Sequence, residues 1–375
     1  MRHRRSVALG TYLCQGDNYP VVFGVRSGWS RAACALTAGF SLALLAACDA
    51  TPALMAAAPP PPAPLLPPTP SFQVGLDHVS LLRSGPATFG ELRALIDGAR
   101  TSVHVEVYEF GQAPLVDALI TAHRRGVAVT VIDDPSELHS VVTSVRLREA
   151  GVDVIDYPVR KLMIDHVKLL VVDADVAVVG GINWGVSSPA NHDYDALVRG
   201  PVVHNLDRVF QRDVVTCGRV ATVPDPVVDP AILVAATLPG TEIRPLALGV
   251  IDSARTSLDL ELFVLTDTGI VHALEAAQRR GVAVRVLLDS SQPSSDPSFT
   301  ALRAAGVTVR LYRSRGELLH AKAIVADSRE VLFGSANWSG GGFARNHELD
   351  VEIVNSAPVA AAMLAQMALN WHASG

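Results

Sequence analysis

The sequence has few cysteines, which excludes most of the crosslinks and sites that thiols build. Four cysteines occur among 375 residues, and three of them lie in or beside an N-terminal leader, at positions 14, 34 and 48. Only Cys217 remains for the folded part of the chain. One thiol can form neither an internal disulfide nor a cysteine-based metal site. We therefore expect Cys217 to be a small buried apolar residue.

Positive charge and aromatic side chains are also scarce. The formal net charge is −6, and aromatic residues make up 5% of the chain. Residues 1–47 hold five arginines and one acid, a balance of +4, so the remaining residues carry −10. A protein whose main partner is duplex nucleic acid needs a basic face to neutralise phosphates. Nucleic acid is therefore the less favoured partner, although a local basic cleft in an acidic chain is compatible with it.

The leader contains an apolar run from Ala32 to Ala47 that is short and rich in small residues. Such a run has the shape of a signal-peptide core rather than of a membrane-spanning helix. It ends in "LLAAC", which resembles a bacterial lipobox with Cys48 as the residue to be lipidated. The pattern predicts a lipoprotein signal peptide over residues 1–48 and an exported lipoprotein anchored to a membrane of the cell envelope. An ordinary secretory signal or a membrane anchor is the alternative.

Residues 49–72 form a proline-rich and alanine-rich linker that includes "PPPPAPLLPPTP". Proline at this density cannot sustain a helix or a sheet ladder and favours extended polyproline II. We expect a stalk that holds the folded part of the chain away from the membrane.

The rest of the chain is an internal duplication with a period of about 155 residues. Three pairs of segments match at that offset: "IDGARTSVHVEVYEF" with "IDSARTSLDLELFVL", "RRGVAVTVIDD" with "RRGVAVRVLLD", and "LREAGVDVI" with "LRAAGVTVR". The period is too long for a solenoid. We therefore expect two copies of one unit, over residues 73–223 and 224–375.

Strand and helix patterns alternate within each copy. Val103, Val105 and Val107 fall on one face of an expected strand, and "LVDALITAHRRG" is then typical of an amphipathic helix closed by glycine. The run "VAVTVID" suits a strand that is covered on both faces. Another helix and strand follow, then two apolar runs that predict a hairpin, and finally a closing helix. The fold class is therefore α/β, with two tandem homologous repeats, each a mainly parallel mixed sheet flanked by helices.

Each copy also places a histidine and a lysine two residues apart at the start of an apolar strand, in "HVKLLVVD" and "HAKAIVAD". Alternate residues of a strand project to the same side, so His166 and Lys168 point together, as do His320 and Lys322. Lysine supplies positive charge to phosphate oxygens, and histidine can attack phosphorus or transfer a proton. A single such pair on a surface is usually incidental. Two pairs in register within a duplication indicate an anion site.

These segments resemble the signature of the phospholipase D superfamily, H-x-K-x4-D followed by a small-residue turn and an asparagine. The resemblance covers roughly residues 80–373, and both copies are complete: His166, Lys168, Asp173 and Asn183, then His320, Lys322, Asp327 and Asn337. The resemblance implies that the turn contacts the substrate phosphate through Ser335 in the second copy. In the first copy Gly181 stands where the family usually has serine, so one hydroxyl donor is missing from these contacts.

The resemblance implies that the copies pack with pseudo-twofold symmetry, so that both histidines face one phosphodiester. One histidine attacks phosphorus to form a phosphohistidine, the other protonates the leaving alcohol, and water then releases the product. We assign His166 as the nucleophile and His320 as the acid, although the symmetry of the motif allows the reverse. The lysines and asparagines stabilise the pentacoordinate oxygens. No cofactor and no metal are implied, and the sequence shows no cluster of cysteines or carboxylates.

The family also places an acid about 28 residues after each histidine to orient its ring. Asp193 and Glu348 occupy these places, with plain surface charge as the alternative. Asp173 and Asp327 belong to the signature, but each ends a strand before a hairpin turn. For these two aspartates we favour a turn-capping role over a chemical one.

Three further pairs of residues occupy equivalent places in the two copies: Trp184 and Trp338, Glu106 and Glu261, His192 and His347. The tryptophans are expected to pack under the active-site loop, with substrate stacking as the alternative. The glutamates lie in mid-strand, where an unpaired acid is costly, so they contact the floor of the site or pair with a buried partner. The two histidines adjoin the orienting acids and are expected to be structural.

The superfamily cleaves phospholipids, joins phosphatidyl groups and cuts DNA or RNA. The lipidated leader and the acidic mature chain favour hydrolysis of a phospholipid headgroup ester to phosphatidic acid and an alcohol. The alternatives are a metal-independent endonuclease and a phosphatidyl transferase of the cardiolipin synthase type. The transferase is disfavoured because the "RS" pair that cardiolipin synthases usually carry after the asparagine is absent. A non-enzymatic lipid-binding lipoprotein is disfavoured because both motifs are complete.

Overall fold

The computed structural model describes residues 70–82, 85–238, 240–313 and 316–374. The predicted signal peptide, the lipidation site at Cys48 and the linker up to residue 69 lie outside the described residues. The first strand starts at Ser71, inside the predicted linker, so the folded part begins slightly before the predicted boundary at residue 73. In the part of the chain that the structure describes, no helix combines the length and the apolar character needed to cross a bilayer.

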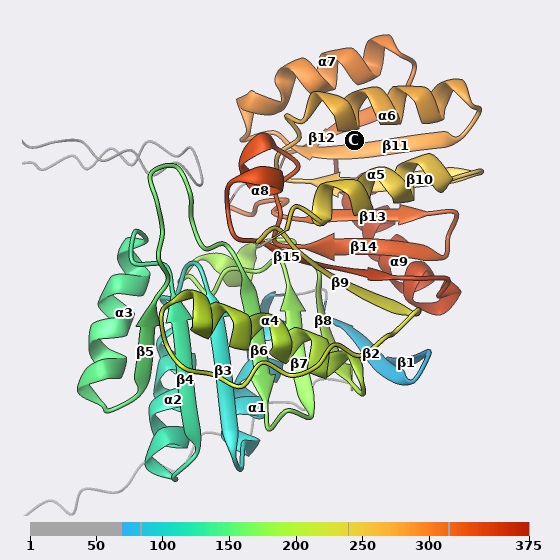
Figure 1. Cartoon of the computed structure of the whole chain (residues 1–375). Coiled ribbons are helices and arrows are strands. Elements are labelled where there is room, and N and C mark those ends of the chain that lie inside the picture. The colour runs from blue at the N-terminus through green and yellow to red at the C-terminus, as the bar shows by residue number, and fades with distance from the viewer. Residues whose placement is uncertain (1–69, 83–84, 239, 314–315, 375) are drawn as a thin grey trace, which may run out of the picture. The chain divides into compact units, whose positions relative to one another are not determined.

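The first repeat forms an eight-stranded sheet in the order β1-β2-β8-β7-β6-β3-β4-β5 (Figure 1). Its strands are β1 (Ser71–Val74), β2 (Asp77–Leu82), β3 (Ser102–Val107), β4 (Ala128–Asp133), β5 (Asp153–Asp156), β6 (Lys168–Val172), β7 (Val176–Gly180) and β8 (Asp195–Arg199). Its helices are α1 (Gly85–Gly98), α2 (Ala113–Arg124), α3 (Leu138–Glu149) and α4 (Val202–Thr216), with a short turn of 3-10 helix, η1 (Ser188–Ala190).

The second repeat forms a seven-stranded sheet in the order β12-β11-β10-β13-β14-β15-β9. Its strands are β9 (Ile232–Ala236), β10 (Ser257–Leu262), β11 (Ala283–Asp289), β12 (Thr308–Tyr312), β13 (Lys322–Ala326), β14 (Glu330–Gly334) and β15 (Leu349–Ile353). Its helices are α5 (Ile243–Ser253), α6 (Thr268–Arg279), α7 (Asp296–Ala304), α8 (Gly340–Ala344) and α9 (Ala357–Ala373), with η2 (Pro293–Ser295) before α7. The α/β class and the two repeats are as predicted.

Both sheets are mixed, but their pairing is less parallel than the sequence predicts. Parallel pairing is confined to β3–β4–β5 in the first sheet and β10–β11–β12 in the second. The remaining pairs are antiparallel, because the chain returns through the predicted hairpins β6–β7 and β13–β14 and then adds β8 and β15 beside them. Helical crossovers favour parallel neighbours, whereas tight turns allow only antiparallel ones.

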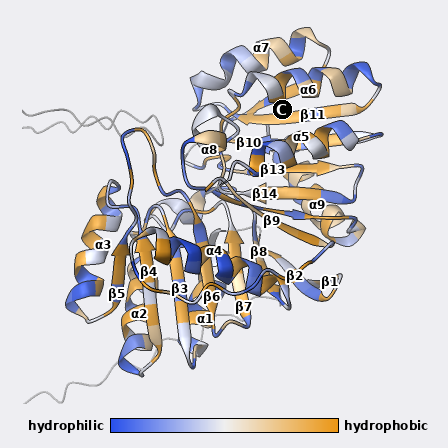
Figure 2. Ribbon diagram, in the orientation of Figure 1, coloured by the Kyte–Doolittle hydropathy of each residue, from blue (hydrophilic) through white to orange (hydrophobic). Residues whose placement is uncertain are grey.

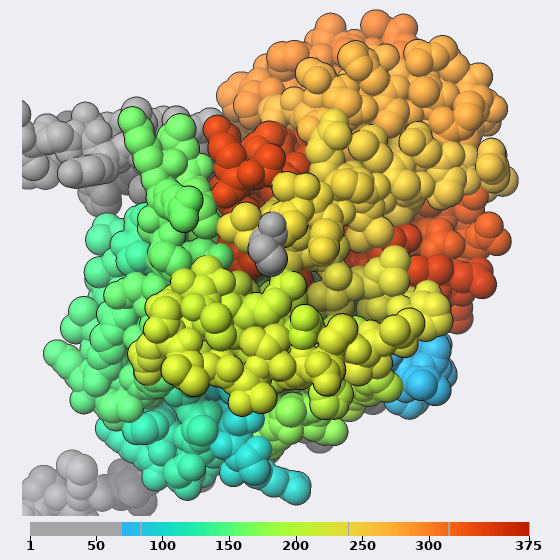
Figure 3. Space-filling model, viewed as in Figure 1, coloured from blue at the N-terminus to red at the C-terminus, as the bar shows by residue number. Residues whose placement is uncertain are grey.

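Each sheet is covered on both faces. Val103, Val105 and Val107 of β3 are fully buried in a cluster with residues of α1 and α2. On the opposite face His104 contacts Asp207 of α4, with its Nδ1 2.7 Å from the carboxylate. The predicted closing helices are present as α4 and α9. Figure 2 shows strands rich in apolar residues and an α4 rich in polar ones, and Figure 3 shows α4 lying over the surface of the first repeat.

One hydrophobic cluster joins the two repeats. It contains Val198 and Phe210 from the first repeat and Ala323, Phe333 and Met363 from the second. Two isolated bridges connect the repeats reciprocally, Asp165 with His347 and His192 with Leu319. These bridges relate equivalent positions of the two copies, so the predicted pseudo-twofold packing brings the segments before β6 and β13 to one interface.

Candidate active site

The two motif histidines stand just before the strands that carry the motif lysines. His166 precedes β6 and His320 precedes β13, and their side chains are about 2% exposed. Each of these segments pairs with the other repeat: the His166 amide donates to the carbonyl of His347 at 2.7 Å, and the His192 amide donates to the carbonyl of Leu318 at 2.8 Å. The interface between the repeats therefore positions both histidines.

The acids that orient the histidines are exchanged between the repeats. Nδ1 of His166 lies 2.8 Å from Oε2 of Glu348, which belongs to the second repeat. Nδ1 of His320 lies 3.1 Å from both carboxylate oxygens of Asp193, which belongs to the first. The structure thus brings Asp193 and Glu348 to the motif histidines. Because each acid occupies the Nδ1 side of its imidazole, Nε2 is the nitrogen that each ring presents for chemistry.

The two orienting carboxyls have different environments. Burial would by itself raise the pKa of Asp193, but the charges of His320, Lys322 and Lys168 lower it below its ordinary value. Burial raises the pKa of Glu348 to about 7, although Lys168 and the Ser335 hydroxyl oppose the rise. Lysines of both repeats act on both carboxyls, which shows that the two motifs form one electrostatic unit.

The motif lysines lie against their own histidines. Nζ of Lys168 donates to the carbonyl of His166 at 2.7 Å and lies 5.5 Å from the centre of the Tyr108 ring. Nζ of Lys322 donates to the carbonyl of His320 and lies 2.9 and 3.0 Å from the two nitrogens of that ring. Two buried cations beside two imidazoles form a site for a group of negative charge.

The motif asparagines complete this site from the loops after β7 and β14. Asn183 and Asn337 are buried, and the structure shows no hydrogen-bond partner for either side-chain oxygen among the described residues. Two acids that our sequence analysis missed hold these loops. Asp195 accepts from the Ile182 amide at 3.3 Å, and Asp350 accepts from the Ala336 amide at 3.0 Å. Their sequence signal was present, because each follows an orienting acid by two residues in both copies.

Ser335 was expected to contact the phosphate, with Gly181 at the equivalent place in the first copy, and the structure places both against the orienting acids. The Ser335 hydroxyl donates to Oε2 of Glu348 at 2.6 Å and accepts from the Leu349 amide at 2.9 Å. A Cβ at Gly181 would lie 2.7 Å from Oδ1 of Asp193 and 3.0 Å from the carbonyl of Gly334. Glycine therefore occurs at position 181 because Asp193 fills the space that a side chain would need.

Asp173 and Asp327 lie at the far ends of β6 and β13, away from the histidines. A rise of about 3.3 Å per residue puts each of them roughly 16 Å beyond its motif lysine. The Asp173 carboxylate accepts from the amides of residues 100–102, and Asp327 accepts from those of residues 255–257. The structure thus gives these two aspartates the capping role and does not bring them into the site.

The other paired residues are mostly structural. Trp184 and Trp338 are buried, and their carbonyls accept from backbone amides of the loops before α2 and α6. Glu261 pairs with a buried partner, since it accepts from the Tyr194 hydroxyl at 2.8 Å and from Asn370 at 3.0 Å. His192 lies near the surface beside Glu317 and Tyr312. Cys217 is only partly buried.

Comparison with known proteins gives consistent matches. A family profile described as "Cardiolipin synthase, PLD-like domain" matches residues 92–214 and 248–371. The chain is 28% identical over 330 residues to a cardiolipin synthase of Geobacillus kaustophilus, covering 75% of this chain and 64% of that protein. It is 29% identical over 317 residues to cardiolipin synthase A of Pseudomonas putida, covering 74% and 65%. The chain therefore spans slightly less than two thirds of the length of these curated relatives.

Solved structures show the same fold at low sequence identity. Phosphatidylserine synthase of Haemophilus influenzae superposes with a TM-score of 0.62 and 12% identity, covering 82% of this chain and 88% of that one. Polyphosphate kinase of Porphyromonas gingivalis superposes with a TM-score of 0.57 and 15% identity, covering 79% and 47%. Each of the two segments that match the family profile lies in one repeat and contains one of the histidine–lysine pairs.

Proposed function

The chain belongs to the phospholipase D-like family whose profile is described as that of cardiolipin synthase, and on this premise we propose that it is a phosphatidyl transferase. It would move the phosphatidyl group of a phospholipid to an alcohol through a phosphohistidine. The observation that carries the proposal is the meeting of two complete motifs at one interface, with each histidine bonded to an acid of the other repeat.

This proposal reverses the order of the hypotheses that the sequence suggested. From the sequence, phospholipid hydrolysis was the preferred hypothesis. Phosphatidyl transfer was disfavoured because the "RS" pair is missing after Asn337. The relatives that match along most of both repeats are named cardiolipin synthases, which favours the transferase alternative. A match along both repeats outweighs the absence of one dipeptide.

In the proposed mechanism the two histidines have different roles. Nε2 of His166 attacks phosphorus, and the bond between phosphorus and the alcohol oxygen breaks as His320 gives its proton to that oxygen. The hydroxyl of the acceptor then passes its proton to His320 and attacks phosphorus, which breaks the bond to His166. The two lysines and the two asparagines stabilise the charge on the phosphoryl oxygens during both steps.

The assignment of His320 as the acid is supported by its partner. Asp193 remains ionised because His320 and the lysines lower its pKa, so it stabilises the positive charge that His320 carries when it holds a proton. Burial of both histidines also favours transfer over hydrolysis, since a phosphohistidine that water reaches easily would be hydrolysed.

We propose that the substrate lies in a bilayer to which the protein is attached. Lipidation at Cys48 would keep the folded part within reach of its lipid, and the proline-rich linker would set the distance. Labelling of the chain with a radioactive fatty acid, and loss of the label in Cys48→Ser, would support this attachment.

The reaction is tested with the full chain and phosphatidylglycerol vesicles, followed by mass spectrometry of the lipids and of released glycerol. We expect cardiolipin and glycerol from the wild type, and at least a hundredfold less from His166→Ala or His320→Ala. His204→Ala, which replaces an exposed histidine of α4, is the matched control and should retain full activity. Phosphatidic acid as the sole lipid product would make the protein a hydrolase. Cleavage of single-stranded DNA with no change in the lipids would make it a nuclease.

A further inference from the structure

A second group of buried ionisable side chains lies behind the His166–Glu348 pair and has no part in the proposed reaction. Glu106 of β3, Asp165 and His347 each offer one ligand atom, and these atoms lie within 4.8 Å of one another. All three residues are 0% exposed. Asp213 of α4 adds a third carboxylate, because its Oδ2 lies 2.9 Å from Nε2 of His347. The sequence showed no such cluster, since the fold assembles it from distant segments of both repeats.

The negative charge of this cluster is not balanced by the side chains around it. Both carboxylate oxygens of Glu106 and Oδ2 of Asp165 have no hydrogen-bond donor among the described residues, apart from a proton that the two carboxyls can share. His347 can carry only one positive charge against three carboxylates, and its Nε2 lies 3.7 Å from Glu106. Buried carboxylates without donors cost several kcal/mol unless a cation joins them.

The equivalent position in the second repeat has hydrogen-bond donors in place of acids. Glu261 is the counterpart of Glu106, and a tyrosine hydroxyl and an amide NH2 donate to it. The reciprocal bridges make Leu319 the counterpart of Asp165. Asn370, which donates to Glu261, lies on the buried face of α9, and Asp213 lies on the buried face of α4. One copy therefore surrounds its glutamate with donors and apolar side chains, whereas the other surrounds it with acids and a histidine.

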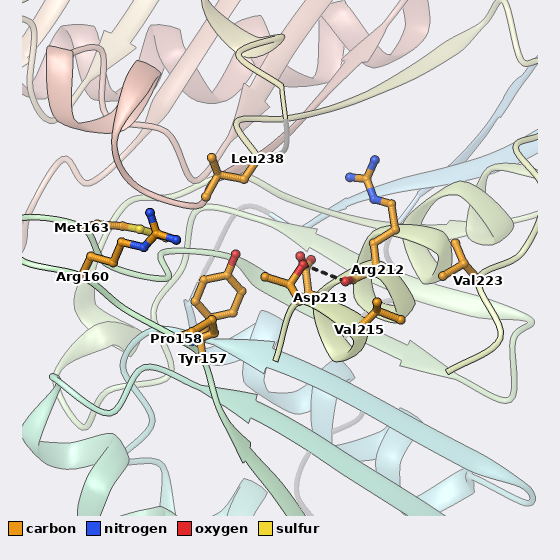
Figure 4. Close-up of a pocket in the computed structure, with 10 residues that line it drawn as sticks. Tyr157, Pro158, Arg160, Met163, Arg212, Asp213, Val215, Val223 and Leu238 are labelled. Carbon is orange, nitrogen blue, oxygen red and sulfur yellow. Dashed lines mark hydrogen bonds between the residues drawn. The ribbon is translucent and has the colours of Figure 1, made fainter. Parts of the chain in front are cut away.

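A cavity of about 480 Å³ reaches the edge of the cluster (Figure 4). Tyr157 and Asp213 line it, and the Tyr157 ring is stacked on His347 with centroids 5.2 Å apart. Arg160 and Arg212 also line the cavity, to either side of these two residues. Within the described ranges neither arginine forms an ion pair with the carboxylates, so they leave the charge of the cluster uncompensated. The cavity offers an ion a route from solvent to Asp213.

We propose that Glu106, Asp165, His347 and Asp213 bind one divalent transition-metal ion, Zn²⁺ or Mn²⁺. Carboxylate oxygens together with an imidazole nitrogen suit these ions, whereas sites for Mg²⁺ and Ca²⁺ are built from oxygen alone. Metal–ligand bonds of about 2.0–2.2 Å put two ligands of one ion up to roughly 4.4 Å apart. The observed spread of 4.8 Å closes to this value with shifts of a few tenths of an ångström.

The ion would have a positioning role rather than a catalytic one. Asp165 directly precedes His166, and His347 directly precedes Glu348, so one ion would link the two segments that carry the nucleophile and its orienting acid. The His166 amide already donates to the carbonyl of His347 at 2.7 Å. The ion would strengthen this connection between the repeats without touching the substrate.

The test measures metal content and is independent of the proposed reaction. The untagged full chain is incubated with Zn²⁺ or Mn²⁺, dialysed against metal-free buffer and analysed by mass spectrometry of the elements. We expect about one ion per chain for the wild type, and a rise of several degrees in Tm when the metal is returned to chelator-treated protein. Glu106→Gln, which keeps the shape of the side chain, should retain less than about a tenth of the metal.

Two further variants make the result decisive. Asp165→Leu combined with Asp213→Asn gives the first repeat the chemistry of the second, where these residue types are already accommodated, and should fold without retaining metal. Glu261→Gln changes the equivalent glutamate of the second repeat and should retain the ion. The proposal is overturned if the wild type retains no more metal than the charge-removed variants, or if its Tm does not respond to either metal. Equal loss of metal in Glu261→Gln would also overturn it.

Discussion

Asp193 and Glu348 occupy equivalent places in the two copies, yet the pKa values of their carboxyl groups are shifted in opposite directions. The cations around Asp193 lower the pKa of its carboxyl, which keeps it ionised. For Glu348 the effect of burial is larger than that of the cations and raises the pKa to about 7. Single residues therefore make a duplicated site asymmetric, as the proposed two-step acid–base chemistry requires. Gly181 and Ser335 differ for the same reason. Asp193 occupies the space that a side chain at position 181 would need, whereas Glu348 accepts a hydrogen bond from the Ser335 hydroxyl.

Gly181→Ser tests this account of the departure from the family signature. On the signature alone, serine would restore a phosphate contact and increase activity. From the structure we expect kcat to fall at least tenfold, because the new Cβ would lie 2.7 Å from Oδ1 of Asp193 and displace it from His320. Steady-state kinetics of the folded variant measure the effect. Gly90→Ala, where a Cβ meets nothing within 4 Å, is the control, and higher activity in Gly181→Ser would refute the packing argument.

At the scale of secondary-structure elements, the last residue of the family signature belongs to a hairpin rather than to the site. Asp173 and Ala174 have φ of 55° and 53°, and Asp327 and Ser328 have φ of 50° and 56°. Two successive positive φ values define the tight turn that suits the twist of an antiparallel hairpin, and aspartate tolerates them better than most residues. Each aspartate also accepts a hydrogen bond from the first residue of the neighbouring central strand, β3 for Asp173 and β10 for Asp327.

Asp327→Ala should reduce stability while leaving catalysis intact. The substitution removes the acceptor for three backbone amides and for the Thr256 hydroxyl, which should cost about 1–3 kcal/mol of unfolding free energy. Because backbone donors hold the pKa of Asp327 at about 2, its contribution is present above the unfolded pKa near 4 and is lost as the pH falls from 4 to 2.

Denaturant unfolding at pH 7 and at pH 3 measures this contribution, and kcat is compared at a temperature where the variant is folded. Asp175→Ala removes an exposed acid of the other hairpin turn that forms an ion pair with Arg199, and it should change stability by less than about 1 kcal/mol. A large fall in kcat for folded Asp327→Ala would show that the aspartate acts in the chemistry after all.

At the scale of the whole molecule, the site exists only because two repeats exchange acids across their interface. A consequence is that each orienting acid should share the phenotype of the histidine in the other repeat. If His320 is the general acid, a leaving group that needs no proton should restore much of the activity of His320→Ala and of Asp193→Asn. It should not restore His166→Ala, which lacks the nucleophile.

The comparison uses a p-nitrophenyl phosphodiester of a diacylglycerol beside the natural lipid. We expect the loss caused by Asp193→Asn to shrink at least tenfold with the p-nitrophenyl substrate, and the loss caused by His166→Ala to stay unchanged. Recovery of His166→Ala in place of His320→Ala would reverse the assignment of the two histidines. Recovery of neither would mean that proton transfer to the leaving group does not limit the reaction.

Buried acids also determine how the stability of the whole molecule depends on pH. Burial raises the pKa of Glu261 to about 7 and that of Asp350 to about 8. A raised folded-state pKa gives stability that is fully present below the unfolded pKa near 4 and is lost as the pH rises through 7 to 8. We expect Tm to fall between pH 5 and pH 8, with each such group contributing a slope of about 1.4 kcal/mol per pH unit.

Scanning calorimetry across this range tests the expectation. Glu261→Gln removes one of the titrating groups and should make the slope visibly shallower, while Glu91→Gln, at a partly exposed site of α1, should leave it unchanged. A Tm that rises or stays constant from pH 5 to pH 8 would mean that these acids are not protonated in the folded state.

The sequence by itself determined the duplication, the fold class, the closing helices and the residues of the two motifs, because repeated segments, periodic apolar residues and short motifs are local patterns. It did not determine the predominance of antiparallel pairs, the crossed pairing of Asp193 with His320 and of Glu348 with His166, or the buried cluster around Glu106. Only the tertiary structure decided these features. Each of these features depends on which distant segments of the chain come together at an interface. A local sequence pattern does not contain that information.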